Sequence, residues 1–154
     1  MLKVPEELFK REFEKVEIGI STLNFFPKDN LEKEQIGYGY DQSCTESSKW
    51  FGKEFVVIGQ DSGFGNPIIA KVDETEIPVF TLFNDDKTSV EKIANSFEQY
   101  IGVLSKIKKT DLYRRDEINN LLDEIENIVP ENSYYYWENL INSAFDFFTD
   151  FYEE

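Results

Sequence analysis

The sequence predicts an α+β fold, with a central antiparallel sheet, helices packed against it and a helical C-terminal extension. Three short β-rich runs, separated by turn residues, occupy the middle of the chain over about residues 55–83. After residue 88 the apolar residues recur at helical spacing. A length of 154 residues suits one domain with a single core. We therefore expect residues 1–154 to form one domain, with residues 110–154 as its C-terminal helical extension.

The N-terminal segment carries signals for a short helix followed by a strand. Pro5 suits a first helical turn, two acids follow it, and apolar residues come at helical spacing, which predicts a helix over about residues 5–15. Apolar and polar residues then alternate, so residues 16–26 are predicted to form a strand. Asp29 or Asn30 is placed to cap another short helical turn.

The middle of the chain alternates between loop and strand signals. Residues 38–53 are polar, contain Gly and Ser and lack a clear period, which predicts a loop. The runs at 55–59, 67–72 and 77–83 are predicted to be neighbouring antiparallel strands. Between the first two lies GQDSGFGNP at residues 59–67, whose glycines and proline are typical of a turn.

Two amphipathic helices are predicted after these strands. Thr88 and Glu91 form a capping box, and the apolar residues of 90–107 gather on one face of the helix that follows. Asp111 is placed to cap a second helix, which Pro130 ends. The apolar stripe of this second helix consists of Ile118, Leu121, Leu122, Ile125, Ile128 and Val129.

A third helix, over about residues 133–152, carries aromatic and apolar side chains around about half of its circumference. A core helix is the simplest interpretation. Tyrosine and tryptophan also dominate protein interfaces, and Tyr135 falls on the otherwise polar face. We single out Tyr135 as a candidate contact residue, together with Trp50 beside the predicted loop, which would be either core or interface rim.

The composition argues against several classes of function. The chain has 16 basic and 31 acidic residues, a net charge of -15 and a pI near 4.4. This charge repels nucleic acid and anionic membrane surfaces, so neither is an expected partner. The chain has no His and a single cysteine, Cys44, which removes Ser-His-Asp and Cys-His catalysis and the usual zinc sites. We expect no enzyme activity, catalytic residue, metal or cofactor.

The sequence also lacks the usual signals for membrane insertion or export. No stretch approaches the roughly 20 apolar residues of a membrane-spanning helix, and Glu6 and Glu7 interrupt the N-terminus before a signal peptide could form. A lone cysteine agrees with a reducing compartment. We therefore expect a soluble, cytoplasmic protein.

Two groups of residues resemble catalytic or ligand sites. The sequence around Ser62 is similar to that of a serine-protease nucleophile, but no His is present to act as its base. A strand signal at Pro67 follows the glycines, where a phosphate-binding loop needs a helix. The acids at 73–76 and 85–86 lack the register of a calcium-binding loop. A carboxylate pair for hydrolysis stays an alternative, because such pairs come from distant parts of a chain.

The strongest functional signal is the charge of the C-terminal part. The 39 residues after Arg115 hold 11 acids and no Lys or Arg. A solvated helix face is one interpretation, although such faces usually mix both signs. The alternative is a patch that meets a basic protein partner. The candidate contact residues on this face are Asp116, Glu117, Asp123, Glu124 and Glu126.

Several short motifs occur in an order that resembles the SUKH superfamily, named partly for fungal Smi/Knr cell-wall regulators. They are Val4-Pro5 before a short helix, FFPKDNLEKEQIGY at 25–38, KWFGKEFVVIGQDSGFGNPIIAKV at 49–72, IPVF at 77–80 and IANSFEQYI at 93–101. The order of these motifs is more specific than any one of them. The resemblance implies an α+β domain with a central antiparallel sheet and without shared catalytic residues.

For many bacterial members the resemblance implies an immunity protein that binds and neutralises a cognate toxin, often a nuclease. A nuclease holds nucleic acid on a basic surface, which an acidic protein can cover. We therefore expect a protein partner such as a basic toxin domain. A regulatory or scaffolding module linked to cell-envelope synthesis is the alternative, and the sequence leaves the oligomeric state open.

Overall fold

The computed structural model describes residues 4–11, 13–19, 21–35, 54–63, 65–82 and 90–152, with residues 147–152 described by their backbone alone. The strands are β1 (Lys15–Ile18), β2 (Ser21–Phe25), β3 (Phe55–Asp61), β4 (Pro67–Lys71), β5 (Val79–Leu82) and β6 (Val90–Ala94). The helices are α1 (Leu31–Glu34), α2 (Phe97–Lys108), α3 (Arg115–Ile128) and α4 (Tyr134–Tyr152). Single 3-10 turns lie at Glu6–Phe9, Lys28–Asn30 and Glu131–Ser133.

These strands form one antiparallel sheet in the order β1-β2-β3-β4-β5-β6, so each strand pairs with its neighbours in sequence. The predicted α+β class is confirmed, as are the three central strands. The turn predicted within GQDSGFGNP lies between β3 and β4, although residues 59–61 still belong to β3 and Pro67 already belongs to β4. Gly65 there has a φ of 76°, and an Asp61 carboxylate oxygen accepts a hydrogen bond of 2.9 Å from the Gly63 N–H.

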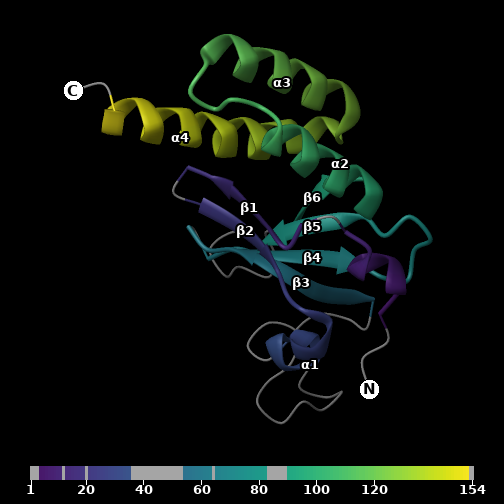
Figure 1. Cartoon of the computed structure of the whole chain (residues 1–154). Helices are drawn as coiled ribbons and strands as arrows, with labels where there is room; N and C mark the ends of the chain where they lie inside the picture. The colour runs from purple at the N-terminus through teal and green to yellow at the C-terminus, as the bar shows by residue number, and fades with distance from the viewer. Residues whose placement is uncertain are drawn as a thin grey trace.

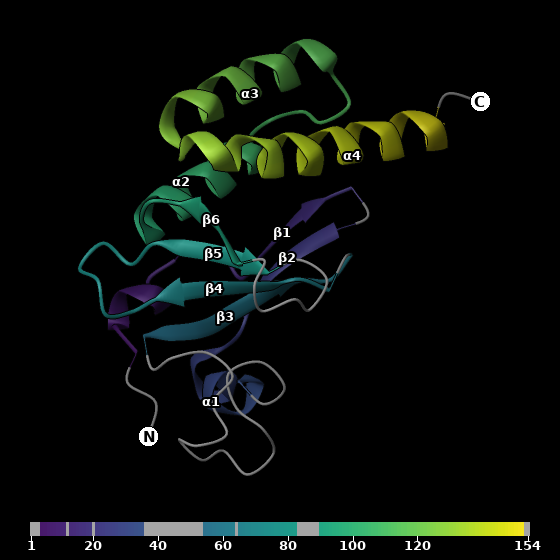
Figure 2. The ribbon, with the colours of Figure 1, turned by 180° about the vertical axis from the view of Figure 1, so that it is seen from behind.

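Helices α2 and α4 cover the sheet, and both contact its two edge strands, β1 and β6. Helix α3 packs on α2 and α4 and forms the outermost layer, as Figures 1 and 2 show from opposite sides. The apolar stripe predicted for α3 is buried except for Ile128, which is 38% exposed. No helix in the described part of the chain is both long and apolar enough to cross a membrane.

The N-terminal helix predicted over residues 5–15 is wrong in extent. Only the turn Glu6–Phe9 is helical. The Glu14 carbonyl accepts a hydrogen bond of 2.9 Å from the Phe25 N–H, which commits the chain to strand pairing at the point where the helix was expected to end. The predicted short turn near Asn30 is present, although no side chain caps it.

The single strand predicted over residues 16–26 is instead the hairpin β1–β2. Gly19 lies between the two strands with a φ of 65°, a conformation that glycine adopts without the steric penalty of other residues. Apolar residues alternate on both sides of the turn, but the buried positions change from even numbers in β1 to odd numbers in β2. This change of phase is the sign of the turn in the sequence, and the prediction of one strand did not use it.

The helix predicted over residues 90–107 begins later than expected. Val90–Ala94 is strand β6, paired with β5, and α2 starts at Phe97. The Ser96 hydroxyl caps this helix by accepting a hydrogen bond of 2.9 Å from the Gln99 N–H. Glu91, predicted to form a capping box, therefore lies in a strand paired with β5. The other residue of that box, Thr88, lies outside the described residues.

The boundaries of the last two helices agree with the sequence more closely. Asp111 was expected to cap α3, but its carboxylate accepts from the Tyr113 N–H and closes the preceding turn. Helix α3 begins at Arg115 and ends before Pro130. Helix α4 occupies the range predicted for the aromatic helix.

A buried glutamine completes the hydrogen bonding of β3 where β2 no longer pairs with it. Gln35 is 1% exposed and lies at the end of α1. Its side-chain oxygen accepts from the Val57 N–H at 2.8 Å, and its side-chain nitrogen donates to the Val57 carbonyl at 2.6 Å. The same nitrogen donates to the Leu31 carbonyl at 2.9 Å. Gln35 thus substitutes for a strand beside Val57 and attaches α1 to the sheet.

Two contacts attach α4 to the sheet. The fully buried Trp137 donates a hydrogen bond of 2.9 Å from its indole N–H to the Ile93 carbonyl on edge strand β6. On the other edge, a Cβ built on Gly19 would lie 2.7 Å from the Cα of Ala144. The β1–β2 turn therefore approaches α4 so closely that only glycine fits there.

Candidate functional site

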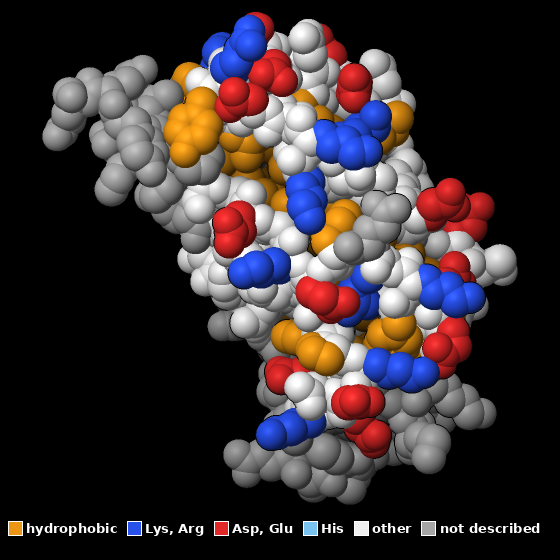
Figure 3. Space-filling view, viewed as in Figure 1, with side chains coloured by type: hydrophobic (Ala, Val, Ile, Leu, Met, Phe, Trp, Pro, Cys, Tyr) orange, Lys and Arg blue, Asp and Glu red, His pale blue; other side chains and the backbone are white. Residues whose placement is uncertain are grey.

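The acids predicted on α3 divide into two groups in the structure. Asp116 and Glu117 pair with Arg114 at 2.9 and 3.7 Å, and Glu124 pairs with Lys106 of α2 at 3.1 Å. These three carboxylates are therefore partly compensated. Figure 3 shows the result as acidic and basic side chains lying side by side over the helical layer.

The remaining predicted acids, Asp123 and Glu126, lie toward the end of α3, where α4 begins. There they approach Tyr134 together with Glu138 of α4. Among the described residues, none of these three carboxylates forms an ion pair. We call Asp123, Glu126, Glu138, Tyr134 and Tyr135 the α3–α4 corner.

Tyr134 reports the electrostatics of this corner. Its pKa is raised to about 12, first by burial, then by hydrogen bonding to Glu138, and then by the negative charges of Glu138, Glu126 and Asp123. Burial is the largest cause, and the smaller contributions from the three carboxylates to this raised pKa show that negative charge gathers around the phenol. Such a region attracts cationic groups of a partner.

Tyr135 is the exposed aromatic of the corner. Its side chain is 68% exposed, and its ring stands edge to face against Tyr134 with the centroids 5.9 Å apart. Its neighbours Tyr136 and Trp137 are buried and belong to the core. The corner thus combines an accessible tyrosine with three carboxylates that lack counter-charges among the described residues.

Some predicted residues are not brought to this corner. Asp116 and Glu117 lie at the opposite end of α3, beside Arg114. The predicted loop at 38–53 and its neighbour Trp50 lie outside the described residues. Glu138 and Tyr134 were missed, because only the return of α4 against α3 places them beside Asp123 and Glu126.

The remaining acids show few features of a reaction centre. Glu91 has a raised pKa, but the cause is partial burial, and no second carboxylate contributes. Asp73 and Glu74 both pair with Lys71, at 3.3 and 2.8 Å. Over the residues that the structure describes, no three His, Cys, Asp or Glu side chains are placed to hold a metal ion.

A cluster of buried polar groups lies in the core around Asp61. Burial raises the pKa values of Tyr100 and Tyr136, and the nearby Asp61 adds to both effects. Asp61 itself is 2% exposed and organises the β3–β4 turn through Gly63. The cluster joins the sheet, α2 and α4 beneath the surface and has a structural explanation.

Comparison with known protein families identifies the sheet-bearing part of the chain. The profile of the SMI1 / KNR4 family (SUKH-1) matches residues 6–102, which is more than half of the 154 residues. The chain belongs to this family. No curated protein and no solved structure matches it.

The candidate site lies outside the region that matches the SUKH-1 profile. The matched region begins in the Glu6–Phe9 turn, includes all six strands and ends within α2. Helices α3 and α4 follow the matched region. The α3–α4 corner therefore belongs to the part of this SUKH-1 protein that the family profile leaves uncovered.

Proposed function

We propose that this SUKH-1 protein is an immunity protein, which neutralises a cognate toxin by covering a basic surface of it with the α3–α4 corner. The observation that carries the proposal is the corner itself, where Asp123, Glu126 and Glu138 have no ion-pair partner among the described residues and lie near Tyr134, whose ring contacts the exposed Tyr135. The net charge of -15 acts in the same direction. Inhibition would be steric and electrostatic and would need no catalytic group.

The physical consequence is fast association that depends on salt. Unpaired carboxylates steer a basic partner during encounter, whereas an aromatic such as Tyr135 contributes to affinity once it is desolvated. Acids already paired with Arg114 or Lys106 should contribute less, because binding has to compete with the existing ion pair.

The test begins with capture of the partner from lysate of the native organism at low and high salt, followed by identification and purification. The association rate is then measured for two matched variants, each removing three negative charges. The corner variant is Asp123→Asn with Glu126→Gln and Glu138→Gln. The control variant is Asp116→Asn with Glu117→Gln and Glu124→Gln.

We expect the corner variant to associate roughly tenfold more slowly at low salt and the control variant to change several times less. A toxin assay with the purified partner should show the same order of lost protection. Equal effects of the two variants would contradict the role of the corner. Binding insensitive to salt, to a partner without toxin activity, would replace the immunity function by a scaffolding one.

A further inference from the structure

The edge strand β1 has backbone groups that the sheet does not use. The Glu14 carbonyl bonds to the Phe25 N–H, and hydrogen-bonded pairs alternate along an antiparallel ladder, so Val16 also faces β2. The N–H and C=O groups of Lys15 and Glu17 consequently point away from the sheet. Among the described residues, these four groups have no hydrogen-bond partner.

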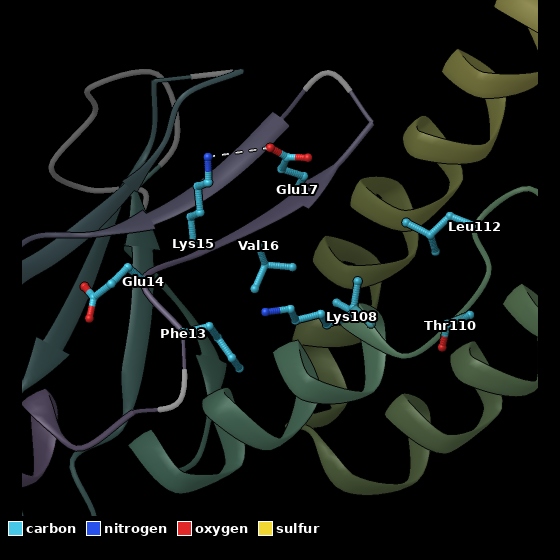
Figure 4. A pocket seen from close by; sticks show the side chains of 9 residues that line it. Phe13, Glu14, Lys15, Val16, Glu17, Lys108, Thr110 and Leu112 are labelled. Carbon is cyan, nitrogen blue, oxygen red and sulfur yellow. Dashed lines mark ion pairs between the residues drawn. The ribbon is translucent and has the colours of Figure 1, made fainter.

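This free edge opens into a groove of about 540 Å³. Residues 13–17 line one side, and Lys108, Thr110 and Leu112 line the other, as Figure 4 shows. Ile107 also lines the groove. Most edge strands face open solvent, whereas this one faces a second wall made by the end of α2 and the chain that follows it. The volume lies within the range of about 300–1,000 Å³ that is usual for binding pockets.

The two faces of the groove differ in chemistry. Toward the helices, Phe13, Val16 and Ile107 provide buried apolar surface. The ammonium group of Lys108 lies 5.1 Å from the centre of the Phe13 ring, and Figure 4 shows it reaching toward the space between Phe13 and Val16. Lys108 is exposed and forms no ion pair with any described residue, in a chain with nearly twice as many acids as bases.

The outer face of the edge carries one charge of each sign. Lys15 and Glu17 are exposed and lie 3.7 Å apart as an ion pair. An added strand places its side chains directly opposite those of β1, where opposite charges stabilise and like charges destabilise the pairing. The edge therefore favours a strand with an acid opposite Lys15 and a base opposite Glu17.

We propose that this groove binds an extended segment of a partner protein, which adds to β1 as an antiparallel strand. The segment carries a base opposite Glu17, an apolar residue opposite Val16 and an acid opposite Lys15, in that order from its N-terminus. Its backbone bonds to the free groups of Lys15 and Glu17, and its apolar side chain packs beneath the aliphatic stem of Lys108. This surface is separate from the α3–α4 corner and does not depend on the toxin hypothesis.

The test uses two blocked peptides of equal composition. The probe is Ser-Thr-Lys-Val-Glu-Thr-Ser, and the control is Ser-Thr-Glu-Val-Lys-Thr-Ser, in which the charges are exchanged. Each is titrated into the full chain labelled with nitrogen-15, and amide shifts and amide hydrogen exchange are followed. We expect saturable shifts centred on Lys15, Glu17 and Lys108, slower exchange at Lys15 and Glu17, and binding roughly fivefold weaker for the control peptide.

Charge exchange in the protein supplies the decisive comparison. The double variant Lys15→Glu with Glu17→Lys should reverse the preference and bind the control peptide more tightly. Lys92→Glu, an exposed charge change on the opposite edge strand β6, should leave both titrations unchanged. Both changes lie on the surface, and thermal unfolding checks that the variants fold like the parent.

Three results would overturn the proposal. The first is the absence of saturable shifts along β1, which would mean that the charged side chains only protect a short edge from pairing. The second is binding in which the double variant keeps the original preference. The third is broadening of β1 amides that grows with protein concentration and without peptide, because a second copy would then occupy the edge.

Discussion

The sheet and the C-terminal helices are held together in different ways. Each strand pairs with its neighbours through a ladder of backbone hydrogen bonds, so the sheet is supported at many positions. Helix α4 is attached through contacts between distant residues, namely Trp137 with Ile93, 44 positions apart, and Ala144 with Gly19. The family-matched sheet is therefore supported along every strand, whereas α4, which carries part of the α3–α4 corner, is held to the two sheet edges at a few positions.

The largest effect is expected at Trp137. Its side chain is fully buried, its indole bonds to the edge of β6, and its ring packs against Tyr100 with the centroids 5.9 Å apart. Trp137→Ala should lower the free energy of unfolding by about 3–5 kcal/mol, because it creates a cavity and removes this bond. Urea denaturation followed by circular dichroism measures the loss.

Amide hydrogen exchange on the same variant tests whether α4 can detach from the sheet while the sheet stays folded. Amides of α4 should lose protection before those of β3 and β4, because the substitution weakens the attachment rather than the sheet. Trp137→Phe, which keeps much of the ring and removes the hydrogen bond, should cost less. Uniform loss of protection across the sheet and helices would show that the two regions form one cooperative unit.

The second largest loss of stability is expected at Gln35, whose hydrogen bonds to Val57 support the sheet and do not involve α4. Gln35→Leu keeps a similar volume but leaves the N–H and C=O of Val57 without their partner in a buried place. We expect a loss of about 2–4 kcal/mol in the free energy of unfolding. Exchange at Val57 should accelerate, while α4 amides keep their protection relative to global unfolding. A loss below about 0.5 kcal/mol would mean that water replaces the glutamine, against its 1% exposure.

Substitutions at Gly19 and Gly65 distinguish the stability lost through a positive φ from the stability lost through a clash with α4. Both glycines have a positive φ, of 65° and 76°, but an added Cβ meets Ala144 at Gly19 and nothing within 4 Å at Gly65. Gly65→Ala should therefore cost about 1 kcal/mol. Gly19→Ala should cost about 2–3 kcal/mol, since it also displaces α4. Thermal or urea unfolding of the two variants gives the difference, and equal costs would refute the close approach.

These contacts also explain which parts of the fold the sequence predicted. The helix stripes of α3 and α4 and the three central strands follow from periodicity, because one face of each packs against the core. The errors occur where pairing between segments decides the structure. Val90–Ala94 fits a helical stripe but pairs with β5. The residues on both sides of Gly19 favour strand, so they suggest one strand although the buried positions change from even to odd numbers at the turn.

The candidate site was predictable only in part. Charge counting identified the acidic face of α3, but Arg114 and Lys106 compensate three of its five predicted acids. The Arg114–Glu117 pair has a spacing of three residues, whereas the Lys106–Glu124 pair depends on the packing of α2 against α3. Glu138 joins the other two acids through the fold, since α4 returns beside α3. The sequence gives no sign of the role of Gln35, because that role depends on the backbone of Val57, which only the fold brings beside it.

The smallest expected effect is a gain in stability, at Gly102. This glycine lies inside α2, where an added Cβ meets no atom within 4 Å, so alanine fits without strain. Gly102→Ala should raise the free energy of unfolding by about 0.5–1 kcal/mol, because alanine loses less backbone entropy in a helix. Helix α2 contacts β1 and β6 of the sheet and also α3, so it links the sheet to the C-terminal helices. If sheet and helices unfold together, urea midpoints from β3 and α4 amides rise equally, whereas a rise confined to α4 would show that the extension unfolds by itself.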